Sequence, residues 1–258
     1  MRASGRLLAM GWLFQFKQMS RSSFDSFLAV LWPLFFATVA FFMFQQGGDA
    51  DSLIYASLGA AVMGIWSATS VTAGSALQRE RWHGTLELLV ATPAHFSLVL
   101  LPIGLATSTI GIYCMVTTLA WGRFAFGIDL TIEEPVLFAL AVPATLLSIG
   151  ALGFLMAVAF ARFRAAWAIG SMTEYPVWLI CGFLVPLTLL PVWVKPISWV
   201  LAPTWGMNAI RQASTGDGSP LDDVLMCALL GAAYIAIGVL GTNTVLRAAR
   251  QKASLSLT

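Results

Sequence analysis

Long apolar segments recur along the whole chain and limit the folds that it can adopt. Each is close to the length of about 20 residues that a helix needs to cross a bilayer. The sequence has six such segments, at Phe27–Phe44, Leu53–Leu77, Phe96–Trp121, Pro135–Phe160, Ala165–Leu187 and Val224–Leu246. Charged residues make up only 10% of the chain, whereas soluble domains carry about 25%. We therefore predict an all-α polytopic membrane protein, a single transmembrane domain over residues 1–258 with six transmembrane helices.

The basic residues predict how these helices are oriented. Lys and Arg concentrate in the cytoplasmic segments of membrane proteins. With the N-terminus inside, most of the 14 Lys and Arg residues fall in cytoplasmic segments, namely Arg2, Arg6, Lys17, Arg21, Arg79, Arg81, Arg162, Arg164, Arg247, Arg250 and Lys252. Both termini are therefore expected to face the cytoplasm, in a multi-pass protein of the plasma membrane, which in bacteria is the inner membrane.

The N-terminal segment, residues 1–24, is expected to lie on the membrane surface. Leu7, Leu8, Trp12 and Phe16 recur at helical spacing, and basic residues flank them. An amphipathic helix with this pattern lies in the headgroup region of a bilayer. The alternative is a frayed cytoplasmic tail.

The segment at residues 186–220 is apolar and aromatic, yet it is interrupted by Pro191, Pro196 and Pro203. Proline removes a backbone donor and clashes inside a helix, so no continuous span fits here. Broken helices at membrane depth occur only where protein or a watery cavity covers them. We predict two short re-entrant helices on the outer side of the membrane. The alternative is an ordinary outer loop rich in aromatic residues.

Residues 78–93 form a partly charged stretch between the second and third apolar segments. Thr85 can cap a first helical turn, Leu86, Leu89 and Val90 share one face, and a proline ends the helix. Such a helix has about two turns and would lie on the cytoplasmic side. We interpret it as a docking helix for a cytoplasmic partner, and the alternative is a solvated loop.

The sequence lacks the motifs that would make the chain an enzyme of a common type. It has no phosphate-binding P-loop, no zinc-binding HExxH motif and no GxSxG nucleophile elbow. The cysteines all fall inside predicted spans, where buried free thiols act as small apolar residues. His83 and His95 have no third ligand nearby in the sequence. We expect no catalytic residue, no metal site and no cofactor in this chain, and no nucleic-acid partner.

Glu174 lies clearly inside a predicted span, roughly 15 Å along the helix from Arg164. A carboxylate at this depth is costly and should face the protein interior or a wet cavity. Glu174 could be a residue of a substrate path or gate. It could also be a protonated side chain that hydrogen-bonds to a Ser or Thr of a neighbouring span, and the sequence leaves both interpretations open.

Two groups of residues, in this order and topology, resemble the permease subunits of ABC-2 type transporters. The first group is similar to that family's first cytoplasmic loop and comprises Arg79-Glu80-Arg81, Gly84-Thr85-Leu86-Glu87 and Thr92-Pro93. The second is similar to the family's pattern after the fifth span and comprises Gly182, Pro186, Pro191-Val192-Trp193, Pro203 and Arg211. Chain length, six spans and the N-terminal helix extend the resemblance over the whole chain.

The resemblance implies an exporter that works as a dimer, with a second copy or a homologous permease, and with two cytoplasmic ATPase subunits that bind ATP and Mg. It implies that residues 78–93 contain a coupling helix. The coupling residues would be Arg79, Glu80, Arg81, Gly84, Thr85, Leu86, Glu87, Leu89, Thr92 and Pro93. The candidates for the substrate path or gate are Glu174, Gly182, Pro186, Pro203 and Arg211. The alternative function is that of an ion-coupled secondary transporter or channel, with Glu174 as the coupling residue.

Overall fold

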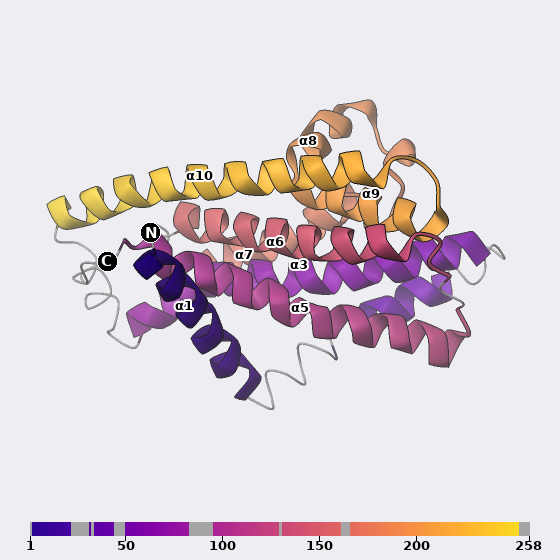
Figure 1. Ribbon diagram of the computed structural model, residues 1–258, viewed down its shortest axis with the longest axis horizontal. Coiled ribbons are helices and arrows are strands. Elements are labelled where there is room, and N and C mark those ends of the chain that lie inside the picture. Colours follow the sequence, from indigo (N-terminus) through magenta and orange to yellow (C-terminus); the bar gives the residue numbers. More distant parts are fainter. Residues whose placement is uncertain are drawn as a thin grey trace.

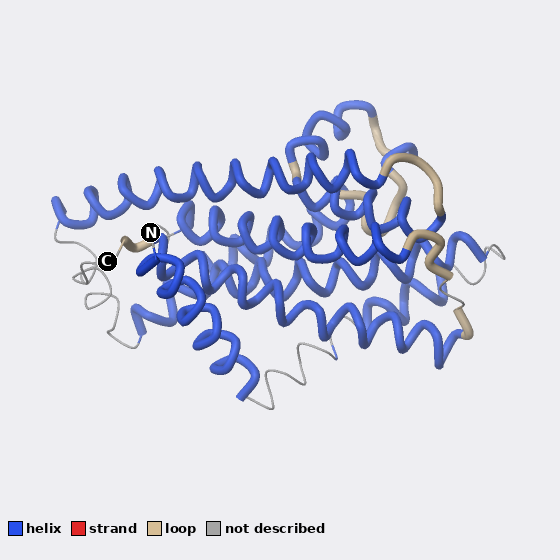
Figure 2. The backbone as a smooth tube through the Cα atoms, viewed as in Figure 1, coloured by secondary structure: helices blue, strands red, loops and turns tan. Residues whose placement is uncertain are grey.

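The computed structural model describes residues 2–21, 31, 34–43, 50–82, 95–128, 131–160 and 166–252. These residues are helical apart from short connections, and no strand occurs among them (Figure 2). The all-α class predicted from the sequence is therefore confirmed. The helices are α1 (Arg2–Arg21), α3 (Ala50–Trp82), α5 (Ser97–Phe126), α6 (Pro135–Phe160), α7 (Ala166–Ile180), η1 (Leu187–Leu189), η2 (Val192–Val194), α8 (Lys195–Val200), α9 (Ala202–Thr215) and α10 (Pro220–Lys252).

Four helices in the described part of the chain are long and apolar enough to cross a membrane. They are Leu53–Ser70 within α3, Ser97–Phe126 in α5, Pro135–Ala159 in α6 and Pro220–Thr242 in α10. The first predicted span is described as the shorter apolar helix Leu34–Met43, and the fifth contains the 15 residues of α7. The chain is thus a polytopic membrane protein, and six complete spans stay a prediction.

Two helix ends differ from those expected. α3 continues to Trp82, so Arg79, Glu80 and Arg81 belong to a helix and not to the loop expected from residue 78. Arg, Glu and Gln are good helix formers, and a drop in hydropathy ends a membrane span without ending the helix. α10 begins at Pro220, with Asp222 and Asp223 in its first turn. Proline and acidic residues both favour a helix N-terminus.

The long helices α3, α5, α6 and α10 run side by side and form the body of the bundle (Figure 1). α7 packs along α3, and α9 packs against α6 and α10. α8 and α9 lie at one end of the bundle, and the start of α1 and the end of α10, the described residues nearest the two termini, lie at the other (Figure 1). We call these the α9 end and the termini end. α3 runs from the α9 end to the termini end, as α6 and α10 also do, while α5 runs in the opposite direction (Figure 1).

α1 lies obliquely across α5 (Figure 1). Trp12 Nε1 donates a hydrogen bond to Thr109 Oγ1 over 3.2 Å, and the ring of Phe16 stacks on Tyr113. The other face of α1 exposes four large apolar side chains, Leu7, Met10, Leu13 and Phe14. One face therefore packs on the bundle, and an apolar face remains that suits contact with lipid. The position of α1 in the headgroup region stays a prediction.

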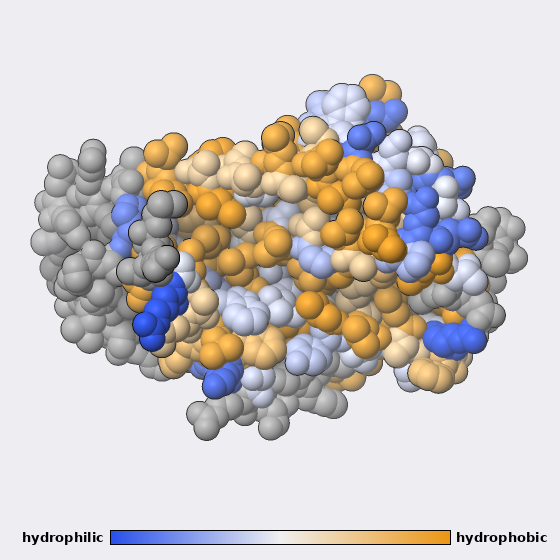
Figure 3. Space-filling model, in the orientation of Figure 1, coloured by the Kyte–Doolittle hydropathy of each residue, from blue (hydrophilic) through white to orange (hydrophobic). Residues whose placement is uncertain are grey.

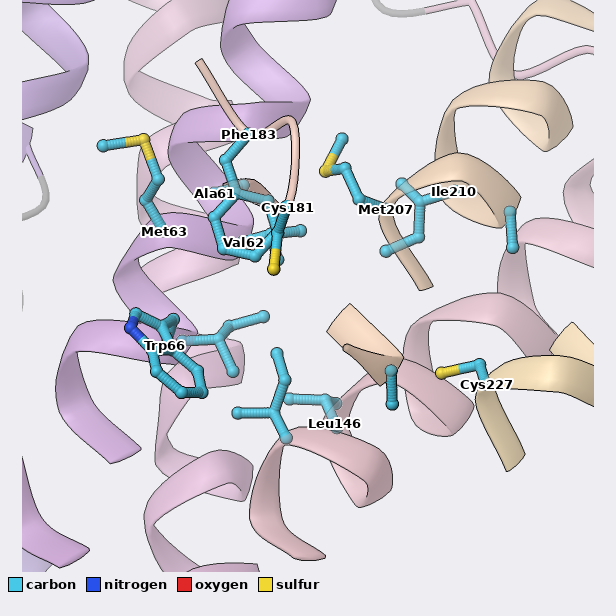
Figure 4. Close-up of a cluster of buried hydrophobic side chains, with 14 of the residues drawn as sticks. Ala61, Val62, Met63, Trp66, Leu146, Cys181, Phe183, Met207, Ile210 and Cys227 are labelled. Atoms are coloured by element: carbon cyan, nitrogen blue, oxygen red, sulfur yellow. The ribbon is translucent and has the colours of Figure 1, made fainter. Parts of the chain in front are cut away.

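The largest apolar core cluster lies where α3, α6, α9, α10 and the end of α7 meet. Figure 4 shows Phe183 and Cys181, just after α7, between the side chains of α3 and those of α9. Trp66 of α3 and Met207 of α9 are both fully buried there. Because α9 contributes to this core, it is part of the bundle and not a loop lying on its surface.

The surface fits a chain that is surrounded by lipid. Figure 3 shows apolar residues across the middle of the visible face, with hydrophilic residues gathered towards the two ends. Only 22% of the apolar span of α10 is buried inside the chain. Large apolar side chains that face outwards are expected in a bilayer, where lipid and not water covers them.

The proline-rich segment after α7 forms several short helices. Pro191 precedes η2, and a proline occupies the first turn of α8 and of α9. Proline fits a first turn because the N–H that it lacks has no partner there. Tyr234 of α10 fixes the junction of α8 and α9, since its hydroxyl donates to Val200 O and accepts from the Ala202 N–H. The prediction that these helices dip into the membrane stays untested by the fold.

Candidate functional site

The end of α7 is a tight turn built around Gly182. Its N–H donates to Leu179 O over 3.1 Å, and the Phe183 N–H donates to Trp178 O over 3.0 Å. These two bonds form a Schellman motif, in which the residue after the helix takes a left-handed conformation. Gly182 has φ +74°, which glycine adopts without steric cost. The turn satisfies the last carbonyls of α7 and leaves those of Gly182 and Phe183 for other partners.

Arg211 of α9 binds both of these carbonyls. Its Nη1 donates to Gly182 O over 2.7 Å, and its Nη2 donates to Phe183 O over 3.0 Å. A third contact, at 3.5 Å, joins Nη2 to Tyr55 O on α3. Hydrogen bonds from a charged donor contribute about 1.5–3 kcal/mol each. The fork of one guanidinium thus ties α9 to the turn after α7 and to α3.

Tyr55 supports this arrangement from α3. The Arg211 guanidinium carbon lies 3.2 Å from the centroid of the Tyr55 ring, a cation–π contact. The Tyr55 hydroxyl donates to Gly182 O over 2.9 Å, so this carbonyl accepts two hydrogen bonds. Tyr55 therefore positions both the cation and its acceptor.

Gly59 of α3 lets the turn approach closely. A Cβ at this position would overlap the Phe183 carbonyl oxygen and lie 3.2 Å from Arg211 Nη2. The obstacle is backbone, which cannot rotate away as a flexible side chain can. We call Arg211, Tyr55, Gly59, Gly182 and Phe183 together the Arg211 clamp.

The charge of Arg211 is balanced by dipoles and by a ring. Its polar partners in the described part of the chain are backbone carbonyls, and Nε is buried there without a partner. Burial lowers the pKa of Arg211 to about 10, and the neighbouring Tyr55 partly offsets this. The guanidinium therefore keeps its charge near pH 7, and its desolvation is only partly compensated.

Glu174 lies on α7, between the clamp and the termini end, and is 9% exposed. Its carboxyl hydrogen-bonds to the side chain of Ser67 on α3. This is the partner type expected from the second interpretation of the sequence, a buried acid held by a Ser of a neighbouring span. The contact joins α7 to α3 at a second point, and it leaves a role in transport open.

The other residues expected at the site are spread over the chain. Pro186 precedes η1, and Pro203 is buried in the first turn of α9; both shape the segment that Arg211 holds. Arg211 itself is partly buried, on α9. Arg79, Glu80 and Arg81 lie in the last turn of α3. Six residues of the expected coupling helix lie outside the described residues, together with the proline that follows it: Gly84, Thr85, Leu86, Glu87, Leu89, Thr92 and Pro93.

The sequence analysis named Gly182 and Arg211 as site candidates but did not identify Tyr55 or Gly59. A tyrosine near the end of a span is typical of an interfacial residue, and no motif singled out Gly59. The available signal was a glycine one helical turn after a tyrosine, since residues four apart share a helix face.

The described residues offer little for a metal or a cofactor. Within them, no group of three or more His, Cys, Asp or Glu side chains lies close enough together to hold a metal ion. Cys114, Cys181 and Cys227 are buried, and none of them forms a disulfide with another described residue. What the clamp can do is mechanical, since it holds one backbone segment against another.

The sequence was compared with family models and with curated proteins. A model described as ABC-2 type transporter matches residues 7–214, which include most of α1, residues 78–93 and the Arg211 clamp. No curated protein matched the chain. The match covers well over half of the chain, and the helical fold agrees with it. The chain therefore belongs to the ABC-2 type transporter family, whose members are membrane permeases of ABC transporters and associate with an ABC ATPase.

Proposed function

We propose that this permease exports its substrate from the cytoplasm or the inner leaflet, powered by a separate subunit that binds ATP and Mg. The family match supports a permease of an ABC transporter. The chain has no P-loop of its own, so hydrolysis would occur in the partner. The same match argues against the ion-coupled alternative with Glu174 as the coupling residue.

The observation that carries the proposal is the continuity of α3. It is one helix of 33 residues from Ala50 to Trp82, about 50 Å long at 1.5 Å per residue. It packs against α5, α6 and α7, and it ends directly before the amphipathic residues 84–91 of the expected coupling helix. A push on that segment from a docked ATPase would move α3, and with it the helices that α3 contacts.

We infer that the coupling residues divide into two roles. Leu86 and Leu89 would fill an apolar groove of the ATPase subunit, where burial contributes about 25 cal/mol per Å². Glu87 would pair with a basic residue of the partner, which contributes about 0–1 kcal/mol if the pair is exposed. Arg79, Glu80 and Arg81 would position the segment from the last turn of α3, and Gly84, Thr85, Thr92 and Pro93 would set its ends.

We also infer the surroundings of the chain. Two permeases, identical or homologous, would act with two ATPase subunits in the plasma membrane, with both permease termini in the cytoplasm. Glu174 and the segment that begins at Gly182 are the candidates for the substrate path and its outer gate.

The test is co-purification of the ATPase subunit with the permease, followed by ATP hydrolysis in lipid. The double variant Leu86→Asp/Leu89→Asp should lose the ATPase, while the permease keeps its own thermal stability. Glu87→Gln is the matched control on the same segment and should keep most of the partner. A double variant that retains the ATPase and exports normally would show that the segment is only a loop.

A further inference from the structure

We propose that the Arg211 clamp is a positioning device that transmits movement of α3 to the segment from Phe183 to Thr215 and so sets whether this segment is closed. The inference rests on the proposed function, because α3 moves only if an ATPase acts at its end. It concerns a different part of the molecule, about 40 Å along α3 from Trp82.

The clamp adds a polar connection between α9, the turn after α7 and α3, which the apolar core also joins. α9 packs mainly on α6 and α10. Arg211 reaches to the opposite side, to the turn after α7 and to Tyr55 O on α3. The segment that follows α7 is thus held by the apolar core that it shares with α3, α6 and α10 and, in addition, by the guanidinium of Arg211.

The contacts of the clamp are short, so a small movement of α3 would change them. Nη1 and Nη2 of Arg211 lie 2.7 and 3.0 Å from the carbonyl oxygens of Gly182 and Phe183. Moving α3 along its axis by one residue rise, about 1.5 Å, would change the length and the angle of the Tyr55 hydroxyl bond to Gly182 O, which is 2.9 Å long. The Phe183 carbonyl fits against α3 only because residue 59 lacks a Cβ, so rotation of α3 would also displace it.

The hydrogen-bonding capacity of Arg211 is only partly used in the clamp. This lowers the energetic cost of breaking the contacts of Arg211. Among the described residues, Arg211 Nε is buried without a hydrogen-bond partner, and the charge is met by carbonyl dipoles and the Tyr55 ring. Water entering on release would satisfy Nε and solvate the cation, compensating for lost bonds. A purely apolar contact would have no such compensation. The arrangement therefore lowers the free-energy cost of releasing the clamp.

The experiment uses the permease–ATPase complex in lipid, with Ser214→Cys on α9 as the reporter. Ser214 is 4% exposed and lies one turn from Arg211, and the native cysteines are buried. A membrane-impermeant maleimide is added without nucleotide and with a non-hydrolysable ATP analogue. With Arg211 present, the labelling rates in the two conditions should differ by about tenfold or more, as expected for a shift between two states.

Variants of the clamp should remove this difference. Arg211→Gln should label rapidly under both conditions while the ATPase still co-purifies. Tyr55→Phe keeps the ring under the guanidinium and loses only the bond to Gly182 O, so it should show an intermediate difference. This milder variant, with Arg211→Lys, carries the test if Arg211→Gln does not fold. Arg123→Gln, a basic residue in the last turn of α5, is the matched control and should behave as the parent.

The outcomes separate this proposal from the proposed function. If the ATPase co-purifies but Ser214→Cys is labelled at the same rate with and without the ATP analogue, the clamp does not transmit movement. This proposal is then overturned, and the proposed function is not. If Arg211→Gln only lowers thermal stability and keeps the nucleotide difference, Arg211 is purely structural and the proposal is again overturned. If no ATPase binds the parent permease, the proposed function fails and this inference fails with it.

Discussion

Glu174 shows how one buried residue can be placed by its contacts. It lies in the α3–α7 interface with its carboxyl hydrogen-bonded to Ser67, so losing it would leave the partly buried Ser67 hydroxyl without this partner. We expect Glu174→Ala to destabilise the fold by about 1–3 kcal/mol. Glu174→Gln should cost less, because an amide can still hydrogen-bond to Ser67. Thermal unfolding in detergent measures both.

Export by the same variants decides whether Glu174 also lies in the substrate path. Glu133→Gln, in the exposed connection before α6, is the control for removing a carboxylate without a buried partner. Slow export by Glu174→Gln with unchanged stability would place the carboxyl in the path. Full export with reduced stability would remove it from the path and leave a structural role.

At the scale of elements, α5 and α6 approach most closely at two glycines. A Cβ on Gly104 would overlap the carbonyl oxygen of Gly150, and one on Gly150 would lie 2.7 Å from Ser108 Oγ. Small residues let membrane helices pack backbone to backbone. We expect Gly104→Ala to force the helices apart and to destabilise the fold by about 1–3 kcal/mol, measured by thermal unfolding. Gly5→Ala, where a Cβ meets open space, should show no loss, and equal behaviour of the two variants would contradict this packing.

The proline-rich segment makes a prediction about access from outside. Val194 is 5% exposed and Ile210 0%, whereas Asp217 lies in the exposed connection between α9 and α10. Single cysteines at Val194 and Ile210 should therefore react with an impermeant thiol reagent added outside far more slowly than one at Asp217. Labelling only from the cytoplasmic side would overturn the expected orientation.

How far the sequence predicted these elements depends on the signal that each contains. The interiors of α3, α5, α6 and α10 follow from apolar length alone, because a bilayer requires it. The ends of the helices were harder to predict. α3 continues past its apolar part to Trp82, because hydropathy marks the part of a helix that lies in the membrane and not the residue at which the helix ends. The clamp was the least predictable feature. It depends on a tertiary contact between Tyr55 and Arg211, which no local pattern contains.

At the scale of the whole molecule, the direction of the helices and the charge distribution agree. α1 begins and α10 ends at the same end of the bundle (Figure 1), as the distribution of Lys and Arg predicts for the two termini. α10 has 33 residues, about 50 Å, and so extends well beyond a hydrocarbon core of about 30 Å. Its last turns hold Arg247, Arg250 and Lys252, which would carry this charge into the cytoplasm.

This topology can be tested with paired reporters. A fluorescent protein that matures only in the cytoplasm, fused after Thr258, should fluoresce, and an alkaline phosphatase active only outside should be inactive there. The same reporters inserted at Asp217 should give the reverse result, because α10 crosses the membrane between the two positions. Since an even number of crossings returns the chain to its starting side, a reporter before Arg2 should match the one after Thr258. An active phosphatase after Thr258 would invert the molecule and leave residues 83–94 on the wrong side for any cytoplasmic ATPase.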